Sequence, residues 1–179
     1  MLKLIGAKIF AAYVHQKNKK WINNPFEAQQ EVFKLLLQEG IKTRFGKEHS
    51  FEKILTPDQF SLGVPVRDYE DLKPYIDSVL EGEANVLWPG RPLYYAKSSG
   101  TTSGAKYIPI SKESMPQHIR AAREALLNYI HKTGKASAVI GKLIFLQGSP
   151  VLEDKKGVAL GRLSGIVAHY VPSLSLIHI

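Results

Sequence analysis

Cysteine is absent from all 179 positions of the sequence. Its absence excludes a disulfide-stabilised scaffold, a thiolate zinc site and a cysteine nucleophile, and it is typical of a cytoplasmic protein. Long apolar runs are absent as well. The most apolar stretch, residues 2–14, contains Lys8 and is shorter than the roughly 20 residues that a membrane-spanning helix requires. We therefore expect a cytoplasmic protein with no membrane partner.

Acidic residues are absent from the first twenty positions, which form a basic segment with five lysines: Lys3, Lys8, Lys17, Lys19 and Lys20. These lysines supply five of the eight formal positive charges, and beyond residue 20 both signs are mixed, as on a solvated globular surface. We therefore expect no nucleic-acid partner. For residues 2–14 the pattern predicts an amphipathic helix that turns four apolar side chains toward the core. They are Leu2, Ile5, Ile9 and Tyr13.

Metal-ligand spacing is also missing. The six histidines form neither a His-x-x-x-His nor a His-Glu-x-x-His pattern, so the sequence predicts no metal ligands. What is present is an ordinary globular composition, with 44% hydrophobic and 22% charged residues. A chain of this length can form one domain with its own core.

Helix signals recur through the first half of the chain. A helix is predicted over residues 25–40, because a capping residue and a proline open it and a glycine ends it. Its apolar side chains recur at helical spacing and are expected in the core: Phe26, Val32, Phe33, Leu36 and Leu37. Thr56 should cap a short helix over residues 57–63. A helical run over residues 68–82 contains Pro74, which we place at a second helix start because an interior proline costs about 3 kcal/mol.

Extended segments follow at residues 93–96 and 107–110, and Pro109 implies an edge position for the second of them. A long helix that ends at Gly134 is predicted next, followed by a buried strand over residues 139–146. The order of strand, helix and strand indicates an α/β fold with right-handed crossovers.

The loop between the two extended segments contains small hydroxyl residues and glycines: Ser98, Ser99, Gly100, Thr101, Thr102, Ser103, Gly104, Ala105 and Lys106. Glycines let successive backbone N–H groups turn toward an anion, hydroxyls can donate to phosphate oxygens, and a lysine adds positive charge. The loop therefore has the parts of a polyphosphate site. A Walker-type loop is disfavoured, because only three residues separate its glycines and an extended segment follows Lys106. A flexible surface loop has the same composition and remains an alternative.

The order of residues in this loop resembles a known motif. Ser99-Gly100-Thr101-Thr102, followed after three residues by Lys106, is similar to the phosphate-loop motif Ser-Gly-Thr-Thr-Gly-x-x-Lys of adenylate-forming enzymes, with Ser103 in place of a glycine. Within that superfamily, residues 20–172 resemble the auxin-responsive-promoter (Gretchen Hagen type) acyl acid-amido synthetases. The supporting blocks are Asn24-Pro25 with Gln29, Thr43–His49, Val64–Val66 with Tyr69–Asp71, Lys73–Ile76, Gly82-Glu83 and Leu87–Gly90.

The resemblance implies a partial N-terminal large domain of an adenylate-forming enzyme, with an incomplete sheet and flanking helices. It implies that ATP activates a small carboxylic acid as an acyl-adenylate, and that an amine or amino acid then displaces AMP. Residues 98–104 and Lys106 would hold the ATP phosphates. Mg²⁺ is implied with ATP because it commonly bridges such phosphates, although no carboxylate of this chain can be named as its ligand.

Three segments follow from this interpretation: a basic helical segment over residues 1–20, a partial adenylation domain over residues 21–172, and an atypical tail over residues 173–179. We interpret the tail as a truncation or a frameshift. Members of the resembled family are several hundred residues long, so we expect this chain to be inactive alone.

Other functions remain open at this point. A carboxylate-CoA ligase of the same superfamily would share the phosphate loop, and a non-catalytic binding module could act through the basic segment. Residues 161–165 suit core packing and acyl-site lining equally well. The oligomeric state, the acid and the acceptor are not specified by the sequence.

Overall fold

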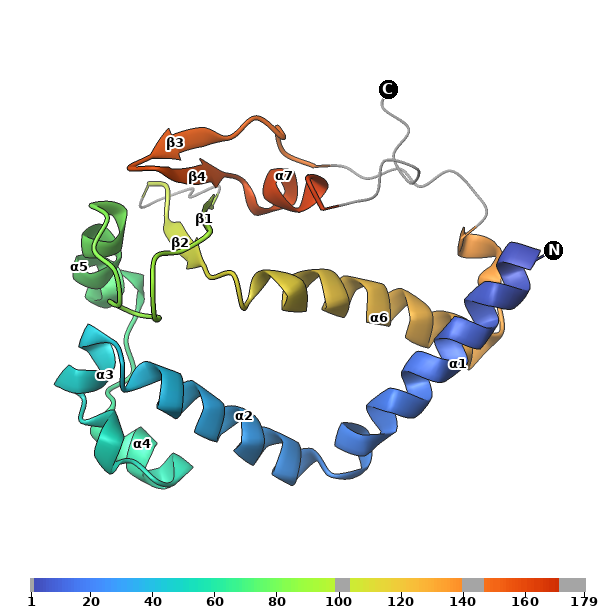
Figure 1. Ribbon diagram of the computed structural model, residues 1–179, viewed down its shortest axis with the longest axis horizontal. Coiled ribbons are helices and arrows are strands. Elements are labelled where there is room, and N and C mark those ends of the chain that lie inside the picture. The colour runs from blue at the N-terminus through green and yellow to red at the C-terminus, as the bar shows by residue number, and fades with distance from the viewer. Residues whose placement is uncertain (1, 99–103, 140–146, 171–179) are drawn as a thin grey trace. The chain divides into compact units, whose positions relative to one another are not determined.

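The computed structural model describes residues 2–98, 104–139 and 147–170 (Figure 1). By their contacts these residues form two compact units. One, the helical unit, comprises the described residues within 1–28, 113–146 and 170–179, and the other, the sheet unit, comprises the described residues within 29–112 and 147–169. Most of the predicted strand 139–146 and the predicted tail 173–179 lie outside the described residues.

The helical unit is built from α1 (Leu2–Asn23), α6 (Met115–Thr133) and the short 3₁₀ helix η2 (Ala136–Val139). The prediction that α6 ends at Gly134 is confirmed, since that glycine has a φ of 68° and its N–H donates to the Ile130 carbonyl. Val139 belongs to η2 rather than to a strand. The core of the unit contains Ala11, Val14, Leu127, Ile130 and Ala136.

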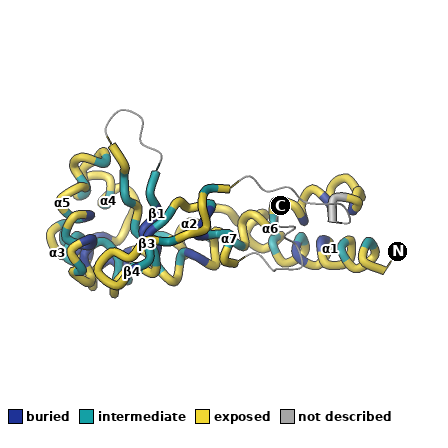
Figure 2. The backbone as a smooth tube through the Cα atoms, turned by 90° about the horizontal axis from the view of Figure 1, so that it is seen from above, coloured by how far each residue is buried: buried dark blue, intermediate teal, exposed yellow. Residues whose placement is uncertain are grey.

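The prediction of which face of α1 packs into the core is wrong. Leu2 and Ile9 are 87% and 65% exposed, and Ile5 and Tyr13 are exposed too. Much of α1 has the yellow colour of exposed residues in Figure 2. The face that packs against α6 instead carries Leu4, Ala7, Ala11 and Val14. These positions also recur every three or four residues, and the two small alanines let the helices approach closely. Both faces of α1 are apolar, so periodicity alone could not decide between them.

The sheet unit begins in α2 (Pro25–Gly40), which starts in the helical unit, and continues with α3 (Arg44–Glu48), η1 (Phe51–Lys53) and α4 (Pro57–Gly63). The capping box predicted for α4 is present: the Gln59 N–H donates to the Thr56 side chain, and the Gln59 side chain accepts from the Thr56 N–H. The predicted core face of α2 is confirmed only in part. Leu37 is buried and Phe33 partly buried, whereas Phe26, Val32 and Leu36 are exposed.

Helix α5 (Tyr69–Leu80) runs through Pro74 without a break, so the predicted second helix start is wrong. Proline cannot donate the hydrogen bond to the carbonyl one turn earlier. Three buried side chains of the same helix offset this loss at about 1.5–3 kcal/mol each: Ile76, Val79 and Leu80. A capping box formed by Asp68 and Asp71 further stabilises its start.

Four strands form one sheet in the order β2-β1-β4-β3. They are β1 (Tyr94–Lys97), β2 (Tyr107–Ile110), β3 (Glu153–Lys155) and β4 (Val158–Gly161). β1 pairs with β2 in antiparallel register and with β4 in parallel register, so the expected edge position of β2 and Pro109 is confirmed. The described sheet with its helices confirms the α/β fold class.

Tyr95 of β1 is fully buried and anchors the core of the sheet unit. It packs with Val158, Leu160 and the buried side chains of α5, and its hydroxyl donates to the Val79 carbonyl at 2.7 Å. Helix α5 is thereby fixed against the central strands. Among the described helices of the chain, none is long and apolar enough to cross a membrane.

Candidate functional site

The predicted phosphate loop connects the antiparallel strands β1 and β2, and its two ends are joined by hydrogen bonds. The Ser98 N–H donates to the Lys106 carbonyl at 2.9 Å, and the Lys106 N–H donates to the Ser98 Oγ at 3.2 Å. Gly104 has a φ of 84°, in the left-handed region that favours glycine. The intervening residues Ser99, Gly100, Thr101, Thr102 and Ser103 lie outside the described residues. The hairpin therefore presents both ends of this loop from a fixed base.

Tyr69, the first residue of α5, fixes the second end of the loop. The Tyr107 N–H donates to the Tyr69 hydroxyl at 2.8 Å. The Lys106 ammonium lies 5.1 Å from the centroid of the Tyr69 ring, within the range of a cation–π interaction. The positive charge of the motif lysine is thus held beside the start of α5.

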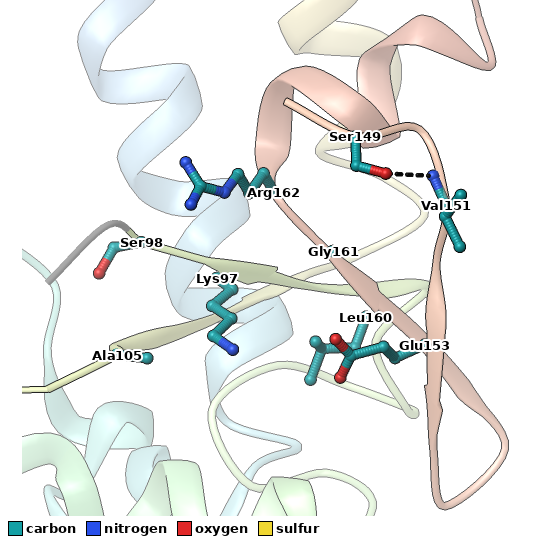
Figure 3. A pocket seen from close by; sticks show the side chains of 9 residues that line it. All are labelled: Lys97, Ser98, Ala105, Ser149, Val151, Glu153, Leu160, Gly161 and Arg162. Atoms are coloured by element: carbon teal, nitrogen blue, oxygen red, sulfur yellow. Dashed lines mark hydrogen bonds between the residues drawn. The ribbon is translucent and has the colours of Figure 1, made fainter. Parts of the chain in front are cut away.

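A cavity of about 400 Å³ opens where β1 and β4 end (Figure 3). Because β1 and β4 are parallel, their carboxyl ends meet at one edge of the sheet, the position where ligands commonly bind in α/β proteins. The cavity is lined by Lys97, Ser98, Ala105, Ser149, Val151, Glu153, Leu160, Gly161 and Arg162. The lining combines two cations, two hydroxyls and one carboxylate with apolar groups.

Residues 147–150 and the short helix α7 (Leu163–Ala168) pack tightly on one side of this cavity. The Gly148 N–H donates to the Ser164 Oγ at 2.9 Å. A Cβ atom on Gly165 would lie 2.1 Å from the Ser149 carbonyl oxygen, and a Cβ on Gly148 would lie 2.7 Å from the Arg162 Cδ. The two glycines therefore permit contacts that a larger residue would prevent. Residues 161–165 thus take part in core packing, one of the two roles considered for them.

The predicted site residues do not all lie at the cavity. Ser98 lines the cavity, whereas Lys106 is not among its lining residues and lies against Tyr69. Lys97 lines the cavity and was not predicted, and Arg162 lines it too, although residues 161–165 were considered only for packing or for lining the acyl site. Lys97 directly precedes the hydroxyl-rich loop, and this position in the sequence could have marked it as a site residue. Arg162 is 64 positions away from Ser98 along the chain, so only the parallel pairing of β1 and β4 brings it close.

Within residues 2–98, 104–139 and 147–170, no group of three or more His, Asp or Glu side chains could hold a metal ion. Mg²⁺ that binds together with ATP takes most of its ligands from phosphate and water oxygens, so it would need no such group. The hydroxyl, backbone and cationic groups of the hairpin instead suit the phosphates themselves.

Several blocks that carry the family resemblance contact one another. The Arg44 guanidinium donates to the Glu83 carboxylate at 2.8 Å, and the Tyr75 hydroxyl donates to the Glu48 carboxylate at 2.5 Å. The pKa of the Tyr75 hydroxyl is raised, chiefly because this hydroxyl donates a hydrogen bond to the Glu48 carboxylate. Thr43 is buried and caps α3 through the Gly46 N–H. These residues join α3 to α5 and the segment after it, which is a structural role.

Comparison with known proteins matches residues 14–174 to the model of the GH3 family N-terminal domain. The chain is 26% identical over 136 residues to jasmonoyl--L-amino acid synthetase JAR4 of Nicotiana attenuata, covering 74% of this chain and 23% of that protein. It is 31% identical over 114 residues to indole-3-acetic acid-amido synthetase GH3.15 of Arabidopsis thaliana, covering 62% of this chain and 19% of that protein. The chain thus spans about a quarter or less of the length of these relatives.

Proposed function

Because this chain belongs to the GH3 family, we propose that it supplies the ATP-phosphate-binding part of an acyl acid-amido synthetase. The observation that carries the proposal is the β1–β2 hairpin, whose hydroxyl-rich loop starts at Ser98, beside the cavity at the carboxyl ends of β1 and β4. One relative is named as a jasmonoyl–L-amino acid synthetase and the other as an indole-3-acetic acid-amido synthetase. We infer a small carboxylic acid and an amine or amino acid as the substrates here.

The proposed reaction has two steps. A carboxylate oxygen attacks the α-phosphorus of ATP, so that an acyl-adenylate forms and pyrophosphate leaves. The nitrogen of the acceptor then attacks the acyl carbon, the bond to AMP breaks, and the nitrogen loses a proton. In the first step negative charge grows on the leaving pyrophosphate, so groups that hold its oxygens lower the barrier.

This chain contributes to the first step by holding the β- and γ-phosphates. The Ser98 hydroxyl already accepts from the Lys106 N–H, and its proton is available for a phosphate oxygen. The hydroxyls and N–H groups of residues 99–103 and the N–H of Gly104 would add further donors. Mg²⁺ would reduce the charge of the phosphates when bound with ATP, and its ligands are not assigned to residues of this chain.

Lys106 would provide the fixed counter-charge. Its ammonium lies over the Tyr69 ring, a contact that does not neutralise the charge as a carboxylate would. Within the part of the chain that the structure describes, Lys106 forms no ion pair. Its charge is therefore available to a phosphate that approaches the second end of the loop. ATP is abundant in the cytoplasm, where we propose that the protein acts.

A pyrophosphate-exchange assay tests the proposal in a full-length protein, in which this chain is continued by the remaining part of a family member. Lys106→Ala should lower carboxylate-dependent ATP–pyrophosphate exchange about 10- to 100-fold, because it removes a charge-assisted phosphate contact. Lys53→Ala removes an exposed lysine of η1 and should leave the exchange rate unchanged.

Two results would reject parts of this function. Equal exchange rates in the Lys106→Ala variant and the parent protein would reject the phosphate-loop assignment. Comparison of amino acids with coenzyme A as acceptors tests the second step, and exclusive formation of a thioester would show a carboxylate-CoA ligase instead of an amide-forming enzyme.

A further inference from the structure

Two cations line the cavity without belonging to the predicted phosphate loop. Lys97 is the last residue of β1, and Arg162 follows the last residue of β4. In the parallel register Ala96 is opposite Gly161, so Lys97 and Arg162 occupy the next positions of adjacent strands. Figure 3 shows the two side chains extending in different directions from these neighbouring positions, and both line the cavity.

The stem of Arg162, an exposed residue, passes close to Gly148. The missing side chain of Gly148 leaves room for this stem, since a Cβ there would lie 2.7 Å from the Arg162 Cδ and 3.0 Å from its Cβ. Gly148 is itself held by the hydrogen bond from its N–H to the Ser164 Oγ. A guanidinium on a partly restricted stem loses less conformational entropy when it binds an anion.

The two cations have no carboxylate that neutralises them directly. Across the described residues, neither Lys97 nor Arg162 is within ion-pair distance of an acidic side chain. Glu153 lines the same cavity and lies beside Leu160 in Figure 3, whereas Ser98 lies on the other side of Lys97. An anion should therefore bind at the Ser98 side of the cavity, at a distance from Glu153.

The ligand that suits this arrangement is an oxyanion. Carboxylates and phosphates both bind arginine through paired N–H groups. A phosphate chain is favoured here for two reasons. Ser98, the first residue of the proposed phosphate loop, lines the same cavity, and two unpaired cations match the multiple charges of pyrophosphate better than the single charge of a carboxylate.

We propose that Arg162 and Lys97 form a pyrophosphate site in the cavity at the carboxyl ends of β1 and β4. This site would hold the terminal phosphates of ATP and retain the pyrophosphate that leaves. The inference rests on the proposed function, and it adds two cations that lie outside the hydroxyl-rich loop.

Isothermal titration of the full 179-residue chain with inorganic pyrophosphate tests the site. Arg162→Gln should weaken binding about tenfold or more, because a charge-assisted contact is lost, and Lys97→Gln should weaken it in the same direction. Arg162→Lys keeps the charge and should retain most of the affinity. Glu153→Gln removes the repelling carboxylate and should tighten binding, a gain that misfolding cannot produce.

The outcomes separate this site from the proposed function. Unchanged pyrophosphate affinity in Arg162→Gln and in Glu153→Gln would overturn the site, even if Lys106→Ala still abolished ATP–pyrophosphate exchange. Loss of affinity in Arg162→Gln with a gain in Glu153→Gln would support the site, even if Lys106→Ala left exchange intact. The site would also be overturned if the parent chain bound no pyrophosphate. The same holds if Arg162 bound the carboxylate of glycine in preference to pyrophosphate.

Discussion

Individual glycines determine how closely residues 147–150 approach α7 beside the cavity. The space that a Cβ would occupy on Gly165 is taken by the Ser149 carbonyl, and the space at Gly148 is taken by the stem of Arg162. The contact at Gly165 is with backbone atoms, whereas the contact at Gly148 is with the side chain of Arg162. At the residue scale the proposed sites therefore depend on side chains that are absent as much as on those that are present.

Replacement of Gly165 tests this packing. Gly165→Ala should destabilise the sheet unit by about 1–3 kcal/mol, because the added methyl must displace the Ser149 backbone from 2.1 Å. Thermal unfolding followed by circular dichroism measures the effect. The matched control is Gly6→Ala in α1, where no atom lies within 4 Å of the new Cβ, and it should stabilise by about 0.5–1 kcal/mol through helix propensity. Similar melting temperatures for both variants would contradict the account of Gly165.

Part of the candidate site could be predicted from the sequence. The loop, its position between two extended segments and the need for glycine at position 104 follow from local residue order, and the structure confirms the flanking strands and the positive φ of Gly104. The contact between Lys106 and Tyr69 could not be predicted, since 37 positions separate the two residues and only the docking of α5 joins them. The position of Arg162 beside Ser98 could not be predicted either, since only the parallel pairing of β1 and β4 joins them.

Among the helices, α1 and α6 pack through small apolar side chains and a stacked pair of imidazoles. The His15 and His131 rings lie 4.0 Å apart between centroids, with an interplanar angle of 18°. Partial loss of hydration lowers the pKa of His15 below its ordinary value of 6.5, and the charges of His131, Lys19 and Lys132 lower it further. The Asn18 side chain donates to Glu124 across the same helix pair at 2.8 Å.

Acidification should weaken the α1–α6 pair. Because the folded pKa of His15 is below its unfolded value, the contribution of the neutral ring is present above pH 6.5 and is lost as the pH falls through the folded pKa. Thermal unfolding at pH 8 and pH 5 should show a drop in melting temperature for the parent chain and a smaller drop for His15→Gln.

His118→Gln provides the control for this prediction, because His118 is an exposed residue of α6 outside the stacked pair. Its response to pH should equal that of the parent chain. If His15→Gln and the parent chain lose the same melting temperature between pH 8 and pH 5, the stacked pair does not couple α1 and α6 to protonation.

The presence of a helix or strand was easier to predict than the face that a helix buries or the partner with which a strand pairs. Thr56 and Gln59 form a full capping box that is visible in the sequence, and α4 begins and ends as predicted. The β3–β4 hairpin was missed because its turn is Lys156-Gly157, where both residues have positive φ, rather than the Asn-Gly or Asp-Gly that marks such turns. Pro74 was placed at a helix start because its local cost is visible in the sequence, while the burial that offsets it is not.

At the scale of the whole molecule, the chain combines a helical unit and a sheet unit and belongs to the GH3 family. The proposed function is assigned to the sheet unit, where the β1–β2 hairpin, the start of α5 and the cavity all lie. The matched segment covers 23% of JAR4 and 19% of GH3.15. The complete reaction is therefore proposed for the longer protein, and phosphate binding for this chain.

Phosphorus NMR of ATP at a fixed Mg²⁺ concentration tests that central claim most directly, because it resolves the three phosphates. Addition of the 179-residue chain should shift or broaden the β and γ signals more than the α signal, and the double variant Thr101→Ala with Lys106→Ala should largely remove this effect, since it removes a donor and a charge. Unchanged signals with the parent chain, or equal changes with the double variant, would contradict the assignment of residues 98–106 to the ATP phosphates.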